Sequence, residues 1–219
     1  LTEAIALRQA GISSSLMCWL LDSDDNLDLA EANEIALGIS TMQQLELVPS
    51  SVSIHIKVDT GLGRNGFMPD ALDQVIERVK ARSLNISGVF SHLANTSEVE
   101  DMKQARTFDQ ALAKFEAAGI ELEYRHLAAS AGTLSYPELR YDMVRCGIAI
   151  YGLNPYEDRT VEGVVLTPAM TVTSKVINLK KVPAGHGVSY GYRYRAARET
   201  TLALVPFGYA EGMPRVSEG

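Results

Sequence analysis

Two cations and three glycines lie close together in residues 56–66. Lys57 belongs to an alternating apolar run that predicts a strand, and Arg64 follows it by seven residues. Glycines after a strand allow a tight turn, and such a turn brings the lysine and the arginine face to face. Two cations do not sit together without an anion between them. The segment therefore predicts an anionic ligand, or a modified lysine, at the mouth of a barrel or sheet.

Two further polar segments follow predicted strands. His92 lies in the run S-H-L-A-N-T-S, and Ser130 lies in H-L-A-A-S-A-G. A histidine just past a strand end points toward the mouth of a barrel, and a serine before a helix can donate to a phosphate. Two ordinary roles stay open at this point, namely a structural histidine near a helix cap and a plain N-cap serine.

Arg145 lies in an apolar stretch that predicts a strand. Because arginine is rarely buried without a partner, we expect it to face a cofactor, with the N–H groups of Gly147 and Ile148 holding a phosphate. The alternative is an internal salt bridge to Asp59 or Asp142.

Two tyrosines stand beside glycines near the end of the chain. Tyr190 lies in V-S-Y-G-Y and Tyr209 in F-G-Y-A-E-G, so each has one bare flank and can reach into a cleft. Packing within a sheet is the ordinary alternative. The four histidines have no metal-ligand spacing, and neither a phosphate-binding P-loop nor a G-x-S-x-G elbow is present.

The composition narrows the class of protein. The chain has 219 residues, 46% of them hydrophobic and 21% charged, which is ordinary for a globular protein. Its net charge of −7, without a basic stripe, argues against nucleic acid and against an acidic membrane surface as partners. No apolar run is long enough to span a bilayer. Because the sequence starts without Met inside a helical pattern, we expect a fragment of a longer protein.

Alternating helical and extended patterns must position these side chains. They imply βαβ units and a parallel sheet, and without a G-x-G-x-x-G fingerprint a (β/α) barrel is favoured over a doubly wound sheet. The predicted helices cover residues 2–10, 28–35, 41–48, 70–82 and 99–118. The predicted strands cover residues 36–40, 52–58, 85–91 and 122–127, and residues 15–21 form a short apolar run.

The pattern changes after residue 152. Residues 154–162 are polar and predict a linker, and extended patterns at 166–179, 188–194 and 201–206 predict an antiparallel β segment. We therefore expect two domains, with part of a barrel in residues 1–155 and the beginning of a β domain in residues 156–219.

Six runs, in order, resemble alanine racemase, the fold type III enzyme that uses pyridoxal 5′-phosphate (PLP) to interconvert L- and D-alanine. They are residues 57–66, 90–97, 126–132, 142–152, 174–191 and 202–215. The resemblance implies an α/β fold with a PLP-binding (β/α)8 TIM-type barrel, partial here, and the start of a C-terminal β domain. It also implies a cytoplasmic homodimer, in which each β domain completes the partner's active site, that supplies D-alanine for peptidoglycan.

The resemblance also assigns the two bases of the reaction. Tyr190 matches the catalytic tyrosine, which acts in the partner's site. The other base is a lysine that holds PLP as a Schiff base in a run A-V-V-K-A-N-A-Y-G-H-G, and this sequence does not contain that run. We therefore expect the lysine to lie outside this chain, and the chain alone to be inactive.

The supporting residues carry over by motif. Arg145 resembles the arginine that faces the pyridine nitrogen, and His92 the histidine that links this arginine to the tyrosine. Arg64 resembles the arginine near the phenolic oxygen and the substrate carboxylate. Lys57 resembles a lysine that is often carbamylated to N6-carboxylysine, and Tyr209 a residue at the substrate entrance. The implied cofactor-binding residues are Arg64, His92, Ser130, Arg145, Gly147 and Ile148.

Two departures from the family's pattern accompany these matches. Ala129 stands where the family usually has asparagine, which removes an amide beside the cofactor, and Glu211 replaces the commoner aspartate of G-Y-A-D-G. Three alternatives stay open: a serine racemase, another PLP barrel racemase or decarboxylase, and a non-catalytic PLP-binding barrel.

Overall fold

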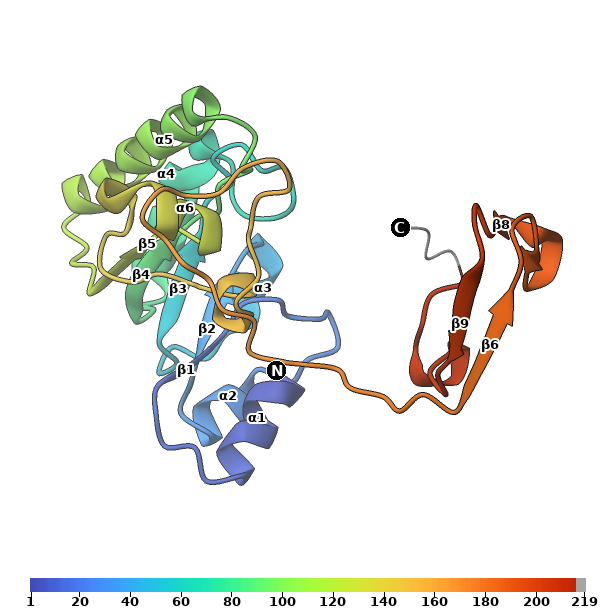
Figure 1. Ribbon diagram of the computed structural model, residues 1–219. Coiled ribbons are helices and arrows are strands. Elements are labelled where there is room, and N and C mark those ends of the chain that lie inside the picture. The colour runs from blue at the N-terminus through green and yellow to red at the C-terminus, as the bar shows by residue number, and fades with distance from the viewer. Residues whose placement is uncertain (216–219) are drawn as a thin grey trace. The chain divides into compact units, whose positions relative to one another are not determined.

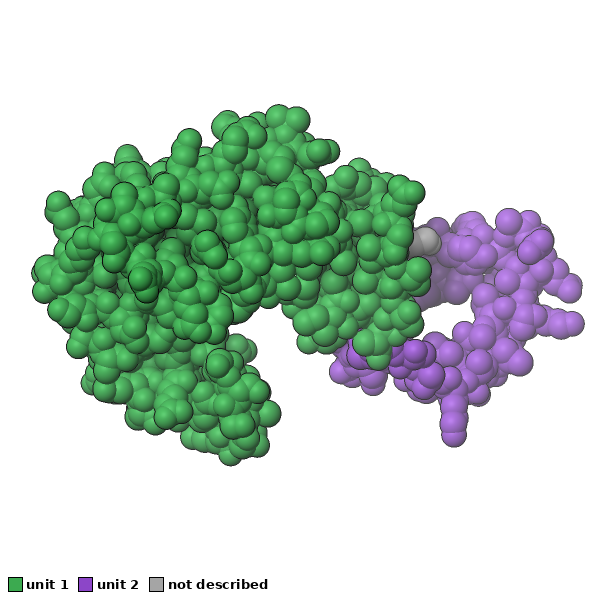
Figure 2. All heavy atoms as spheres, turned by 90° about the vertical axis from the view of Figure 1, so that its left-hand side faces the viewer, with its two compact units in different colours: residues 1–169 green, residues 170–219 purple. Residues whose placement is uncertain are grey.

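The computed structural model describes residues 1–215, which belong to two compact units. Unit 1 comprises Leu1–Ala169 and unit 2 comprises Met170–Gly219 (Figure 2). Residues 216–219 of the predicted β domain lie outside the described residues. The units divide after Ala169, and the boundary that the sequence places after residue 155 stays a prediction.

Unit 1 is built on a parallel sheet whose five strands are ordered β1-β2-β3-β4-β5 (Figure 1). Neighbouring strands are successive in the chain, and each crossover carries helical or turn segments, as in a (β/α) barrel. This confirms the predicted α/β class and parallel sheet. The strands are Leu16–Cys18 (β1), Ile35–Ile39 (β2), Ile54–Lys57 (β3), Ile86–Phe90 (β4) and Tyr124–His126 (β5).

Local signals fix the ends of the helices. Thr41 and Ser97 are N-caps whose side chains accept hydrogen bonds from the amides of Gln44 and Glu100. Gly119, with φ of 73°, follows the C-cap of the long helix α5, which agrees with the predicted end of this helix at residue 118. The helices are Thr2–Gln9 (α1), Asp28–Ala32 (α2), Met42–Leu47 (α3), Leu72–Ala81 (α4), Glu98–Ala117 (α5) and Ser130–Ser135 (α6).

One predicted helix was too long. The pattern over residues 28–35 predicted a single helix, but α2 ends at Ala32 and Ile35 already belongs to β2. Glu34 has a φ of 51°, a left-handed conformation that a helix does not accommodate, so the chain turns into the strand at this point.

The core of unit 1 lies along the sheet. Leu37, Ile39, Ile54 and Ile56 are fully buried in the central strands, as expected for parallel strands covered on both faces. Helix α4 contacts both α3 and α5, and α5 adds Phe108 and Phe115 to the same core. Within residues 1–215, no helix has the length and apolarity needed to cross a membrane.

Unit 2 consists of two short antiparallel pairs. Strand β6 (Asn178–Val182) pairs with β9 (Thr200–Leu204), and β7 (Gly187–Val188) pairs with β8 (Tyr194–Arg195). The prediction of a strand over residues 166–179 was wrong, because the ladder with β9 has only five partner positions and ends at Asn178. The prediction over 188–194 also failed as one strand, since Ser189, Gly191 and Tyr192 have positive φ and form a turn.

We expect that Leu37→Ala will lower the free energy of unfolding of unit 1 by about 2–5 kcal/mol, because it leaves a cavity in a fully buried strand. Leu47→Ala, the matched control, removes the same atoms from a side chain that is 60% exposed and should cost less than about 0.5 kcal/mol. Urea unfolding measures both. Equal losses in the two variants would contradict this description of the core.

Candidate active site

Strands β3, β4 and β5 end at one edge of the sheet, where their last residues are Lys57, Phe90 and His126. A cavity of about 830 Å³ lies at this edge, where (β/α) barrels carry their active sites. All six residues that the sequence proposed as cofactor-binding line this cavity: Arg64, His92, Ser130, Arg145, Gly147 and Ile148. Sequence reasoning therefore found side chains that the fold brings together, and their roles stay predictions.

Arg145 is held in place by neutral acceptors. Its Nη1 donates to Nδ1 of His126 at 2.6 Å. Its Nη2 donates to the carbonyls of Ser91 at 2.5 Å and Leu127 at 3.1 Å, and lies 3.3 Å from Nδ1 of His92. These contacts fix the plane of the guanidinium group without cancelling its charge. Burial, followed by the charge of Arg64, lowers the pKa of Arg145 to about 10, so it stays a cation at neutral pH.

The structure excludes the salt bridges proposed as the alternative role of Arg145. Asp142 instead accepts from Nε of Arg125 at 2.7 Å, and Asp59 accepts from two backbone amides of its own turn. The prediction that Arg145 lies in a strand was also wrong. It makes an isolated bridge to Ala129, is only partly buried, and is soon followed by a 3-10 helix at Ile148–Tyr151.

Lys57 is buried at the end of β3, with 2% of its surface exposed. Its ammonium group donates to Oδ1 of Asn65 and lies 5.7 Å from the centre of the Phe90 ring. Burial lowers the pKa of Lys57 to about 8, and the charges of Arg64 and Arg145 add to this effect. The sequence predicted that Lys57 and Arg64 face each other, and in the structure the charge of Arg64 acts on Lys57 as a repulsion.

The cavity carries an excess of positive charge. His92 feels it as well, since burial and then the charges of Arg145, Arg64 and Lys57 lower its pKa to about 4, which leaves it neutral at pH 7. Among the described residues that line the cavity, Asp101 is the only acid, and it accepts the backbone N–H of Asn95 at 3.1 Å. An anionic ligand therefore fits the electrostatics of this site.

Ser130 does not cap a helix. The N-cap of α6 is Ala129, while the buried hydroxyl of Ser130 accepts from the amides of Gly147 at 3.0 Å and Ala149 at 3.3 Å. The serine N-cap alternative was therefore wrong. A Cβ placed at Gly147 would meet no atom within 4 Å, so the backbone there is open to a ligand. Clustered N–H groups beside a hydroxyl are a suitable cradle for phosphate.

Sequence reasoning missed three residues of the site: His55, Asn65 and His126. A usable signal existed for His55, because the run I-H-I-K alternates and places His55 and Lys57 on the same face of β3. The contact between His55 and His126 joins strands that are not neighbours, and no spacing in the sequence indicates it.

Tyr190 and Tyr209 belong to unit 2, where both side chains are well exposed, at 98% and 74%. Tyr190 begins a 3-10 turn, and Tyr209 begins another. Glu211, the substituted acid, accepts the backbone N–H of Gly208 at 2.7 Å and so stabilises the turn that carries Tyr209. The structure describes these tyrosines within unit 2, and their roles stay predictions.

Comparison with known proteins identifies the family. The model described as "Alanine racemase, N-terminal domain" matches residues 1–155, and "Alanine racemase, C-terminal domain" matches residues 169–219. The chain belongs to the alanine racemase family. An alanine racemase of Beutenbergia cavernae is 39% identical over all of this chain and 62% of its own length. One from Thermobifida fusca is 42% identical over 99% of this chain and 61% of its own length.

Solved structures agree with this assignment. Alanine racemase from Streptomyces coelicolor A3(2) matches 98% of this chain and 61% of its own, with a TM-score of 0.89 and 35% identity. The enzyme from Bacillus anthracis, solved with bound L-Ala-P, gives a TM-score of 0.76 at 31% identity, over 97% of this chain and 58% of its own. The chain thus has the alanine racemase fold, a partial α/β barrel followed by a β-strand domain, and spans about three fifths of the curated relatives it matches.

The stability of unit 1 should depend on the protonation of Lys57. Its folded pKa of about 8 lies below the unfolded value, so between these values the unfolded state binds more protons and stability rises with pH. Below pH 8 the penalty of burying the charge is fully present. We expect Lys57→Met to remove this penalty, and with it part of the rise between pH 8 and 10. The urea midpoint of unfolding, measured at several pH values, tests this. If the midpoint rises equally with pH in the wild type and in Lys57→Met, the prediction is contradicted.

Proposed function

We propose that this protein is an alanine racemase that interconverts L- and D-alanine with PLP by a two-base mechanism, in the cytoplasm, to supply D-alanine for peptidoglycan. Family membership supports the activity. The observation that carries the proposal is Arg145, a cation on the cavity wall that is oriented by neutral acceptors. We also propose a partial barrel in residues 1–155 and a β domain from residue 156.

The residues around the cavity fit PLP. When bound, PLP withdraws electrons from the α-carbon of an amino acid and so makes its proton removable. Ser130 with the amides of Gly147 and Ile148 would hold the phosphate, and Arg64 would lie near the phenolic oxygen and the substrate carboxylate. Arg145 would face the pyridine nitrogen. The uncompensated cations and the open backbone at Gly147 support this arrangement.

Arg145 would limit how strongly electrons are withdrawn. A guanidinium group keeps its proton, so a nitrogen facing it stays unprotonated and accepts less charge. Weak withdrawal suits a racemase, since a long-lived carbanion invites transamination. Barrel decarboxylases usually pair this nitrogen with an acid, so Arg145 disfavours that alternative. A serine racemase would differ only in pocket residues and stays the second candidate, and a non-catalytic PLP carrier would not need the tyrosine-bearing β segment.

Tyr190 would exchange the proton on one face of the substrate, and the lysine outside this chain on the other. The exposure of Tyr190 within its own unit suits a residue that completes the site of a partner subunit in a homodimer. His92 would link the partner's tyrosine to Arg145, because its Nδ1 lies against the guanidinium and leaves Nε2 for another group. Tyr209 would stand at the substrate entrance.

Lys57 would carry the anion that the cations around it lack. With a pKa of about 8, roughly a tenth of Lys57 is the neutral amine at pH 7, far more than for a lysine with the ordinary pKa. The neutral amine attacks carbon dioxide, an N–C bond forms, and one proton is released. The resulting N6-carboxylysine would place a negative charge beside Arg64 and Arg145, where their repulsion now acts.

The role of Tyr190 is testable in a form of the protein that includes the lysine segment of its relatives. Tyr190→Phe should lower racemase activity by about 10²–10⁴-fold, the usual contribution of a general base, with PLP absorbance near its normal value. Tyr194→Phe is the matched control, since Tyr194 is exposed in β8 and has no proposed role. Activity of Tyr190→Phe near wild type in both directions would overturn the assignment.

A further inference from the structure

Two buried imidazoles stand in line behind Arg145. His126, fully buried at the end of β5, receives the guanidinium Nη1 on its Nδ1 at 2.6 Å. Its other nitrogen, Nε2, lies 2.9 Å from Nδ1 of His55, which is 4% exposed in β3. Arg145, His126 and His55 thus form one continuous row of contacts that runs from the cavity wall into the parallel sheet of unit 1.

The donors in this row can be assigned from elementary chemistry. Guanidinium nitrogens only donate, so Nδ1 of His126 must accept, and His126 carries its proton on Nε2. That N–H points at Nδ1 of His55, which must then accept as well. His55 therefore carries its proton on Nε2, and neither ring can be an imidazolium while the row is intact. Burial acts in the same direction, lowering the pKa of His55 to about 4 and of His126 to about 2.

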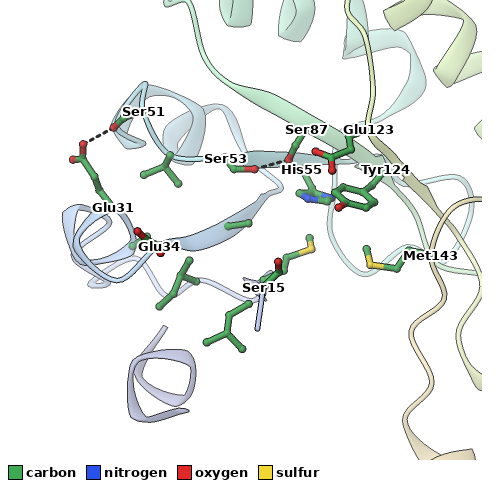
Figure 3. A pocket seen from close by; sticks show the side chains of 16 residues that line it. Ser15, Glu31, Glu34, Ser51, Ser53, His55, Ser87, Glu123, Tyr124 and Met143 are labelled. Atoms are coloured by element: carbon green, nitrogen blue, oxygen red, sulfur yellow. Dashed lines mark hydrogen bonds between the residues drawn. The ribbon is translucent and has the colours of Figure 1, made fainter. Parts of the chain in front are cut away.

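The surrounding structure is shaped to hold both rings. The His126 ring stacks on Phe90 with centroids 4.8 Å apart, and the His55 ring stacks on Tyr124 at 5.8 Å. Gly88, between them in β4, leaves the space for His55, since a Cβ there would lie 2.4 Å from its Nδ1. Figure 3 shows His55 beside Tyr124 in a second cavity. This cavity has a volume of about 550 Å³, and its lining includes none of the proposed cofactor-binding residues.

We propose that His55 is a positioning residue: by accepting from His126 it holds that ring in the Nε2–H tautomer and so fixes the acceptor that orients Arg145. Without the acceptor on His55, His126 can carry its proton on Nδ1 instead. An N–H would then face the guanidinium group of Arg145, and the two donors would push apart. The catalytic consequence rests on the proposed function, whereas the tautomer of His126 does not.

The tautomer can be measured directly in the unmodified protein. Long-range ¹H–¹⁵N spectra of histidine-labelled, cofactor-free protein, in a form as long as its relatives, report which nitrogen carries the proton. We expect both His55 and His126 to be protonated on Nε2 alone at pH 7. A proton on Nδ1 of either ring, or an imidazolium, would overturn the proposal. If both rings carry the proton on Nε2 but the protein has no racemase activity, the proposed function is overturned and the proposed role of His55 still holds.

A pair of variants tests the role of His55. His55→Asn keeps an acceptor at the δ position and should retain the tautomer of His126 and kcat/KM within about threefold. His55→Leu removes the acceptor, so we expect a mixed tautomer and a loss in kcat/KM of about tenfold, as for one hydrogen bond. His186→Leu, the same change at an exposed site of unit 2, should alter neither. An unchanged His126 tautomer in a folded His55→Leu variant would overturn the proposal, and the wild-type spectrum decides it if that variant does not fold.

Discussion

Uncompensated positive charge around one cavity is the constraint on which the rest of the site depends. Lys57, Arg64 and Arg145 repel one another, and Asp101, the one acid among the described residues that line the cavity, accepts a backbone N–H. Like charges that share one site repel one another, so the fold must hold them there at a cost. Lys57 is held at the end of the fully buried strand β3, and Arg145 is held by the hydrogen bonds of its guanidinium group to His126, Ser91 and Leu127.

The parallel sheet explains how residues so far apart in sequence share this cavity. Strands β3, β4 and β5 each end at the same edge, and each is followed by small or polar residues that let the chain approach the site closely. The hydroxyl of Ser130 then ties the start of α6 to the amides of Gly147 and Ala149. The order of the strands therefore determines which residues form the cavity wall, and the loops after the strands contribute the backbone N–H donors.

The sequence predicted well whatever depends on local pattern. The positions of the strands in unit 1, the helix that starts after Thr41, and the proposed cofactor-binding residues that line the cavity follow from periodicity and motif order. It failed where non-local partners decide. The start of β6 at Asn178 depends on where its partner β9 ends, and the contact of His55 with His126 depends on a register that puts Gly88 opposite His55. No spacing within one strand contains that information.

The choice of imidazole over carboxylate behind Arg145 follows from the same charge constraint. A carboxylate in place of His126 would orient the guanidinium at least as firmly, but it would cancel the charge that the cavity presents to a ligand. A neutral imidazole orients without cancelling, yet it has two tautomers, and only one of them accepts from arginine. Neutral support therefore requires a second group that selects the tautomer. His55 meets that requirement, and it fits its buried position because β4 has a glycine, Gly88, beside it.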